Sequence, residues 1–277
     1  MFLLYGATGF VGEVMAGEAK AAGLRPILGG RNQEPLARLA TALNLEHRAF
    51  GLDDAEAVDR ALNGVTVVLN CAGPFMHTFE PMASACVRSG AHYLDITGEI
   101  PVYEGLAAMD ADALARGVML LPGVGFDVVP TDCLAVHLKQ RLPSATHLTL
   151  AFRTQGPGGL PPGTQRTMIE LIPFGNRVRR GGLLVVPERG VKTRAIDFGQ
   201  GPMIATRLTW GDVFMAYHST GIPNIEDYVV VPEATRRQLA KMDYLRPLFR
   251  LSFMRGLCRG WAGRSAATRW RSCLFVQ

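Results

Sequence analysis

Three glycines near the N-terminus restrict the fold of this chain more than any other feature. Gly6, Gly9 and Gly12 are spaced as G-x-x-G-x-x-G, between the apolar run 2–5 and a helical pattern over residues 10–22. Gly6 allows a tight turn out of a strand, Gly9 lets the backbone approach a pyrophosphate, and Gly12 lets the helix pack closely on the sheet. The free N–H groups of the helix N-terminus favour a phosphate. The motif therefore predicts a dinucleotide site formed by Gly6, Thr8, Gly9, Phe10, Val11 and Gly12.

The first half of the chain alternates short apolar runs with helical patterns. Strands are predicted at residues 2–5, 26–28, 47–50, 65–69, 93–94 and 118–121. Helices are predicted at residues 10–22, 33–43, 54–62, 79–89 and 101–116. Alternation at this spacing is typical of βαβ units and a parallel sheet. We therefore expect an α/β fold, a Rossmann-type doubly wound sheet of order 3-2-1-4-5-6, over residues 1–142.

The end of the second predicted strand indicates which dinucleotide is bound. This strand runs into Gly29-Gly30-Arg31-Asn32, without the Asp or Glu that would accept a hydrogen bond from the ribose 2′-OH of NAD. Arg31 instead offers a guanidinium that can bind a 2′-phosphate through two hydrogen bonds. We therefore predict NADP(H) as the cofactor.

Polar and small residues follow the third and fourth predicted strands. Asp53 and Asp54 precede a predicted helix, where an N-cap role explains them and where Asp53 can also touch the adenine. The fourth strand continues into Asn70-Cys71-Ala72-Gly73 beside the switch point of the sheet. We expect Asn70, Ala72 and Gly73 to lie near the ribose and the nicotinamide.

The second half, residues 143–277, is predicted to form an α+β substrate or oligomerisation domain on a mixed or antiparallel sheet. Strands are expected at residues 147–153, 183–187 and 203–210, with turns at 181–182 and 199–201. Helices are expected at residues 164–172 and 232–262. The chain ends in a strand-like run at 272–277, which suggests a fragment of a longer protein.

Three later segments give a more specific resemblance. They are Tyr93-Leu94-Asp95-Ile96-Thr97-Gly98-Glu99, then 123–132, then 216–224. Together with the glycine motif and residues 70–75, they resemble the saccharopine dehydrogenase-like oxidoreductases, and within them the bacterial branch that includes trans-acting enoyl reductases. The resemblance implies an NAD(P)-binding domain, a second domain and hydride transfer to or from a small organic or acyl substrate.

The catalytic residues are less defined. Tyr217 and His218 form the best proton-transfer pair on paper, since a tyrosine can donate to an oxyanion and a histidine titrates near neutral pH. Asp127 and Asp132 are placed in the loop after the sixth strand, and His77 follows the fourth. Structural roles, such as a helix cap at Asp132, explain these residues equally well. A dinucleotide-binding regulatory or lipid-associated protein without turnover therefore stays an alternative.

Composition limits which partners, metals and cellular locations we expect. Residues 236–271 hold nine Arg and one Lys against one Asp, but aromatic side chains for base stacking are sparse, so we do not expect nucleic acid as a partner. The five cysteines and six histidines show no zinc spacing, so no metal site is predicted. Without a signal peptide or a long apolar run, the protein is expected in the cytoplasm. The apolar and basic stretch 239–259 leaves a peripheral lipid contact open, and a homodimer is left open as well.

Overall fold

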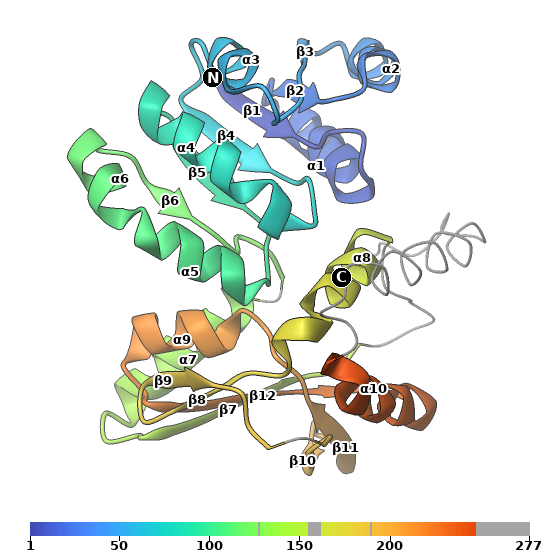
Figure 1. Ribbon diagram of the computed structural model, residues 1–277, viewed down its shortest axis with the longest axis vertical. Helices are drawn as coiled ribbons and strands as arrows, with labels where there is room; N and C mark the ends of the chain where they lie inside the picture. The colour runs from blue at the N-terminus through green and yellow to red at the C-terminus, as the bar shows by residue number, and fades with distance from the viewer. Residues whose placement is uncertain (127, 155–161, 189, 248–277) are drawn as a thin grey trace. The chain divides into compact units, whose positions relative to one another are not determined.

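The computed structural model describes residues 1–126, 128–154, 162–188 and 190–247. The chain divides into two compact units, the first from Met1 to Val129 and the second from Pro130 onward (Figure 1). The boundary lies at the start of helix α7 (Val129–Arg141). The structure therefore assigns α7 to the second unit, whereas the sequence placed residues up to 142 in the first.

The first unit contains a parallel sheet of six strands in the order β3-β2-β1-β4-β5-β6. The strands are β1 (Phe2–Tyr5), β2 (Ile27–Gly30), β3 (His47–Ala49), β4 (Val67–Asn70), β5 (His92–Asp95) and β6 (Leu120–Leu121). The register places Tyr5 opposite both Gly29 and Asn70, so the carboxyl ends of β1, β2 and β4 lie at the same edge. The predicted doubly wound sheet and its strand order are confirmed.

Helices cover both faces of this sheet. They are α1 (Phe10–Ala21), α2 (Gln33–Leu43), α3 (Ala55–Ala61), α4 (Phe79–Ser89), α5 (Ile100–Ala108) and α6 (Asp110–Arg116). Leu4 packs with α1 and α2 on one face, and its neighbour Leu3 packs with α3, α4 and α5 on the other. Successive strand residues point to opposite faces, so an unbroken apolar run is what a sheet covered on both sides requires. The prediction of one helix over 101–116 was wrong in one respect, because Met109 separates this segment into α5 and α6.

The second unit is built around β12 (Asn224–Val230). One edge of β12 pairs in parallel with β7 (His147–Phe152) along nearly its whole length. Because a strand has only two edges, β8 (Val178–Arg180) and β11 (Pro202–Arg207) share the other edge, and both run antiparallel to β12. β9 (Leu183–Val185) pairs with β8 and β10 (Thr193–Asp197) pairs with β11, so that these two strands form the edges of the sheet on this side of β12. The predicted mixed sheet is confirmed.

Two turns of this sheet follow the glycine positions. Gly181 and Gly182, with φ of 54° and 83°, connect β8 to β9. The loop from β10 to β11 is held by Asp197, whose carboxylate accepts the N–H groups of Gly199 and Gly201 at 2.8 and 3.0 Å. Both turns were predicted from their glycines, and in the first of them two consecutive left-handed residues connect the strands with glycine at little cost.

The helices of the second unit are α7, α8 (Pro162–Leu171), α9 (Asp212–Thr220) and α10 (Glu233–Leu245). The sequence did not predict α9, and the strand expected over 203–210 ends at Arg207. Only the first part of the helix expected over 232–262 falls among the described residues, and the run 272–277 lies outside them. Within the described residues, no helix is long and apolar enough to cross a membrane.

Candidate cofactor site

The glycine turn after β1 is tightly packed. Gly6 has φ of 82°, and a Cβ built on it would lie 2.8 Å from the backbone nitrogen of Ala72. A Cβ on Gly12 would lie 2.2 Å from the carbonyl oxygen of Gly6. Both positions therefore require glycine, as the motif predicted. The turn after β1 rests directly on the loop after β4.

The start of α1 provides the features of a phosphate site. Gly9 occupies the N-cap without a side-chain hydrogen bond, and it is exposed together with Phe10. The first N–H groups of a helix have no partner within it, and the helix dipole adds a partial positive charge. With only hydrogen at Gly9, nothing from that residue's side chain stands between a pyrophosphate and these donors. The residues present therefore fit the phosphates of a dinucleotide.

Arg31 and Asp53 lie at the same edge of the sheet. Both are exposed, and both act electrostatically on the buried hydroxyl of Tyr5, which donates to the carbonyl of Phe50 at 3.3 Å. Burial raises the pKa of Tyr5, Arg31 lowers it and Asp53 raises it further. Asp54, not Asp53, caps α3 by accepting the N–H of Ala57 at 3.1 Å, which leaves the Asp53 carboxylate at the edge.

Asn70 is the last residue of β4, and its side chain is fully buried. Its oxygen accepts the N–H of Ala72 at 3.0 Å, and its Nδ2 donates to Thr78 and to the hydroxyl of Tyr93. These contacts hold the loop in which Ala72 and Gly73 lie, with Gly73 exposed. Burial raises the pKa of the adjacent Cys71 thiol to about 12, so this thiol stays protonated at neutral pH.

A buried acid at the end of β5 connects two loops. The Asp95 carboxylate accepts the hydroxyl of Tyr93 at 2.8 Å and the N–H groups of Thr97 and Gly123 at 3.0 Å. Burial raises its pKa to about 6, although the backbone donors act in the opposite direction. Asp95 therefore holds the loop after β6 against the end of β5.

Glu99 performs a similar task for the loop after β4. It is fully buried, and its two carboxylate oxygens accept the N–H groups of Phe75 and Met76, each at 2.8 Å. Sequence reasoning used Tyr93–Glu99 only for the family resemblance and assigned no role to its acids. A sequence signal for these roles exists, because Asp95, Thr97 and Glu99 place polar side chains at every second position from the end of a buried strand.

The catalytic candidates are spread over both units. His77 ends the short 3-10 helix Phe75–His77 after β4 and is exposed. Asp127 lies outside the described residues. The placement of Asp132 in a loop was wrong, because it lies in the first turn of α7 and accepts the hydroxyl of Ser219 at 2.7 Å.

Tyr217 and His218 lie on α9. The guanidinium of Arg179 lies 4.1 Å from the centre of the Tyr217 ring, and His218 stacks on Phe214 at 4.6 Å between ring centres. Burial lowers the pKa of His218, and the charge of Arg179 lowers it further. The imidazole is therefore neutral at pH 7, and its ring contributes to packing.

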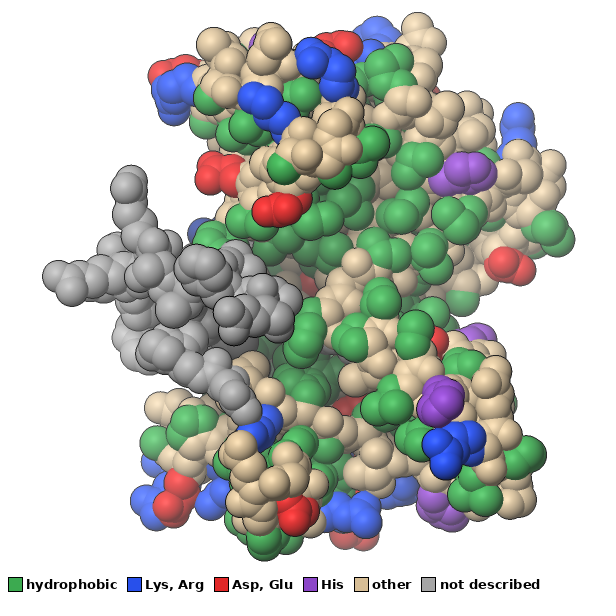
Figure 2. Space-filling model, turned by 180° about the vertical axis from the view of Figure 1, so that it is seen from behind, with side chains coloured by type: hydrophobic (Ala, Val, Ile, Leu, Met, Phe, Trp, Pro, Cys, Tyr) green, Lys and Arg blue, Asp and Glu red, His purple; other side chains and the backbone are tan. Residues whose placement is uncertain are grey.

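The surface charges seen in Figure 2 are mixed in sign, and the described residues offer no metal site. On the face seen in Figure 2, Lys, Arg, Asp and Glu side chains are interspersed within each unit rather than gathered by sign. Among residues 1–126, 128–154, 162–188 and 190–247, no group of three or more His, Cys, Asp or Glu could hold a metal ion. Of the stretch 239–259, residues 239–247 are described, and there Leu239 and Met242 are half-buried on α10.

The glycine turn on a doubly wound parallel sheet defines a dinucleotide-binding Rossmann domain. Residues 2–121 match the family described as the saccharopine dehydrogenase NADP binding domain. The first unit therefore belongs to this family. The resemblance drawn from the motifs is confirmed, and so is NADP as the cofactor of the domain family.

The chain is also similar to individual curated proteins. A human saccharopine dehydrogenase-like oxidoreductase is 27% identical over 180 residues, covering 57% of this chain and 42% of its own length. A trans-acting enoyl reductase of Mycobacterium leprae is 31% identical over 151 residues, covering 50% of this chain and 35% of its own length. The chain thus spans less than half the length of these relatives.

The fold of both units has a solved counterpart. Saccharopine dehydrogenase (L-Glu forming) from Saccharomyces cerevisiae aligns with a TM-score of 0.62 at 14% identity. The alignment covers 86% of this chain and 56% of that one, so it reaches well into the second unit. At this identity the likeness concerns the fold alone.

Proposed function

We propose that the chain is part of an NADP-dependent oxidoreductase that transfers hydride to or from a small organic or acyl substrate. The observation that carries this proposal is the glycine turn before α1, with Arg31 exposed at the same edge of the sheet. The match to an NADP-binding domain family supports it. When bound, the nicotinamide of NADP supplies or accepts the hydride, and the protein positions the reactants.

The cofactor residues are assigned by position. Gly6, Gly9 and Gly12 shape the turn, and the N–H groups at Thr8, Phe10 and Val11 face the pyrophosphate. Arg31 binds the 2′-phosphate, where a guanidinium matches phosphate oxygens in pairs. Asp53 lies toward the adenosine, while Ala72 and Gly73 leave room for the nicotinamide. Asn70 acts by holding that loop, since its amide is fully used within the protein.

The second domain is proposed to bind the substrate or a second copy of the chain. The relatives named enoyl reductase favour an acyl substrate with an enoyl, keto or imino group. Tyr217, His218, Asp127 and His77 are the candidates for moving the proton. Among them, His77 shares a loop with Ala72 and Gly73.

Titration of the purified protein with NADPH and NADH, followed by nicotinamide fluorescence, tests the cofactor assignment. We expect NADPH to bind more tightly, and Arg31→Ala to remove that preference with a loss of about tenfold or more. Arg38→Ala is the matched control, because Arg38 is an exposed arginine on α2 that pairs with Glu34 at the surface. Equal binding of both dinucleotides would remove the role of Arg31, and binding of neither would refute the proposal.

Oxidation of NADPH over a panel of enoyl, keto and imino compounds tests the reaction. Turnover with one class identifies the substrate chemistry. Tight NADPH binding with no turnover on any class would instead favour a regulatory protein that retains the nucleotide fold.

A further inference from the structure

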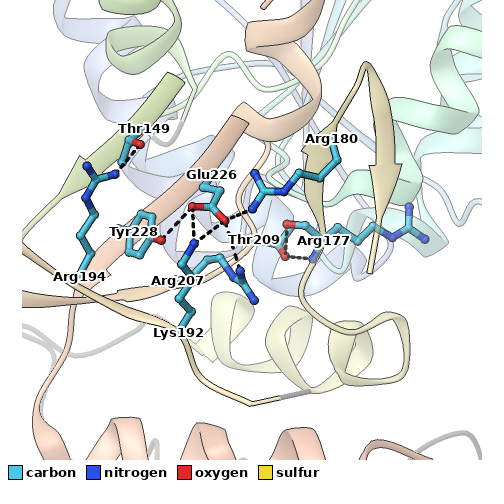
Figure 3. Close-up of polar contacts among 9 residues, drawn as sticks. All are labelled: Thr149, Arg177, Arg180, Lys192, Arg194, Arg207, Thr209, Glu226 and Tyr228. Atoms are coloured by element: carbon cyan, nitrogen blue, oxygen red, sulfur yellow. Dashed lines mark hydrogen bonds and ion pairs between the residues drawn. The ribbon is translucent and has the colours of Figure 1, made fainter. Parts of the chain in front are cut away.

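A cluster of cations surrounds one carboxylate at the centre of the second sheet. Glu226 on β12 accepts hydrogen bonds from Lys192 at 3.1 Å, from Arg207 at 3.3 Å and from the hydroxyl of Tyr228 at 2.9 Å (Figure 3). Arg180 on β8 donates to the same carboxylate. Burial alone would raise the pKa of Glu226, but these hydrogen bonds lower it to about 2. The carboxylate is therefore ionised at neutral pH.

The cluster lies on the face of the sheet that α9 does not cover. Glu226 and Tyr228 share one face of β12, whereas Ile225 lies on the opposite face, as successive strand residues must. Arg179, the partner of Ile225 across the strands, donates to the carbonyl of Val213 on α9 at 2.9 Å. The helix therefore packs against the face opposite to Glu226.

The face that carries Glu226 is concave. Arg194 on β10 donates to Thr149 on β7 at 3.0 Å, although β11 and β12 lie between these two strands in the sheet. Arg153, just after β7, likewise reaches Met203 on β11 across β12. Such contacts require the sheet to curve toward this face, so that side chains from distant strands converge on it.

The concave face has a buried floor and an exposed cationic rim. The side chains of Glu226 and Arg207 are only 9% and 8% exposed, and the Nε of Arg207 has no hydrogen-bond partner among the described residues. Arg180 and Lys192 are 43% and 49% exposed, and Arg194 is exposed as well. Arg180, Lys192 and Arg207 pair with Glu226, and Arg194 lies on the same face, so these four cations and one carboxylate carry an excess of three positive charges.

We propose that this concave face binds a phosphorylated ligand through Arg180, Lys192 and Arg194, with Glu226 and Arg207 fixing their positions. A guanidinium has five N–H donors, and among the described residues Arg180 and Arg194 have one acceptor each, so most donors remain for a ligand. A phosphate group carries about −1.5 to −2 charges at pH 7 and neutralises the excess better than one carboxylate would. A second copy that presented the same face would bring like charges together, which disfavours a symmetric dimer here.

Calorimetric titration with inorganic phosphate and with pyrophosphate, at constant ionic strength, tests this site. We expect Arg180→Gln/Arg194→Gln to weaken binding about tenfold or more, and Arg194→Gln alone to weaken it severalfold. The single variant guards against misfolding, because Arg194 does not contact Glu226. Arg237→Gln is the matched control, since Arg237 is an exposed arginine on α10 with one surface partner.

A further variant separates this site from the dinucleotide turn. Arg31→Ala should leave phosphate binding to the second unit unchanged, whatever it does to NADPH. Phosphate affinity that is unchanged in both glutamine variants, or equally reduced by Arg237→Gln, would overturn the proposal. Tighter binding of acetate than of phosphate would overturn the phosphate class.

Discussion

The carboxylate of Glu99 accepts the backbone N–H of Phe75 at 2.8 Å, across a separation of 24 residues in the chain. With Met76 as its second donor, Glu99 ties the loop after β4 to the segment after β5. Both loops lie at the edge of the sheet where the cofactor is proposed to bind.

Glu99→Ala should reduce the free energy of unfolding by about 2–4 kcal/mol. The substitution leaves two buried N–H groups without an acceptor, and hydrogen bonds to charged groups contribute about 1.5–3 kcal/mol each. Urea denaturation measures the change. Glu34→Ala is the control, because this exposed glutamate forms a surface pair with Arg38 and should change stability by less than about 0.5 kcal/mol. A similar loss of unfolding free energy in both variants would show that the buried contacts of Glu99 contribute no more than a surface ion pair.

Asp95 should give the stability a specific pH dependence. The folded state binds the Asp95 proton more tightly than the unfolded chain, since its pKa is about 6 against an ordinary value of 3.8. This group's contribution to stability is therefore greatest below about pH 4 and falls as the pH rises to about 6, by roughly 2–3 kcal/mol. Asp95→Asn should remove this component. Unfolding free energies of both proteins from pH 4 to 7 measure it, and two parallel curves would contradict the expectation.

Gly12 and Gly17 lie on the same helix and should respond oppositely to alanine. A Cβ at Gly12 meets the carbonyl oxygen of Gly6 at 2.2 Å, so Gly12→Ala must displace the turn and should weaken NADPH binding and stability. Gly17 has nothing within 4 Å of its Cβ position, so Gly17→Ala should stabilise the protein by about 0.5–1 kcal/mol through helix propensity. Thermal unfolding with and without NADPH measures both effects. Equal behaviour of the two variants would refute the packing argument for Gly12.

Tyr217 can be tested for a structural role separately from a catalytic one. Its ring lies under the guanidinium of Arg179, and such a contact is worth about 0.5–2 kcal/mol. Tyr217→Phe keeps the ring and should preserve stability, whereas Tyr217→Leu should lose about 1 kcal/mol or more in urea denaturation. If Tyr217→Phe abolishes turnover while its stability is unchanged, the hydroxyl takes part in the reaction. Loss of stability in Tyr217→Phe would show that the hydroxyl, and not the ring, is the structural element.

The first unit could be predicted from local sequence because its determinants are local. Apolar runs such as Phe2–Tyr5 are unbroken where both faces of a strand are buried, and each glycine of the turn has its own steric reason. Strand order then followed from the doubly wound topology. The role of Asn70 could not be predicted in the same way, because Tyr93 and Thr78 reach it only in the folded sheet.

The second unit was harder to predict, because the contacts that determine its central strand also join residues that are distant in the sequence. β12 is its central strand, yet its sequence includes Glu226 and Asp227, which resemble a surface segment. The cations that neutralise Glu226 come from positions 19 to 46 residues away, as for Arg207 and Arg180. A charged residue can occupy a central strand only with such partners, and they are not visible in a short window of sequence.

The contact between Gly6 and the backbone of Cys71 and Ala72 also bears on how a nucleotide enters. Because a single Cβ would not fit between them, the turn after β1 and the loop after β4 are packed in direct backbone contact. Neither segment can move away from the other without disrupting the packing of β1 against β4. A nucleotide that binds at this turn as proposed would therefore meet a surface completed during folding.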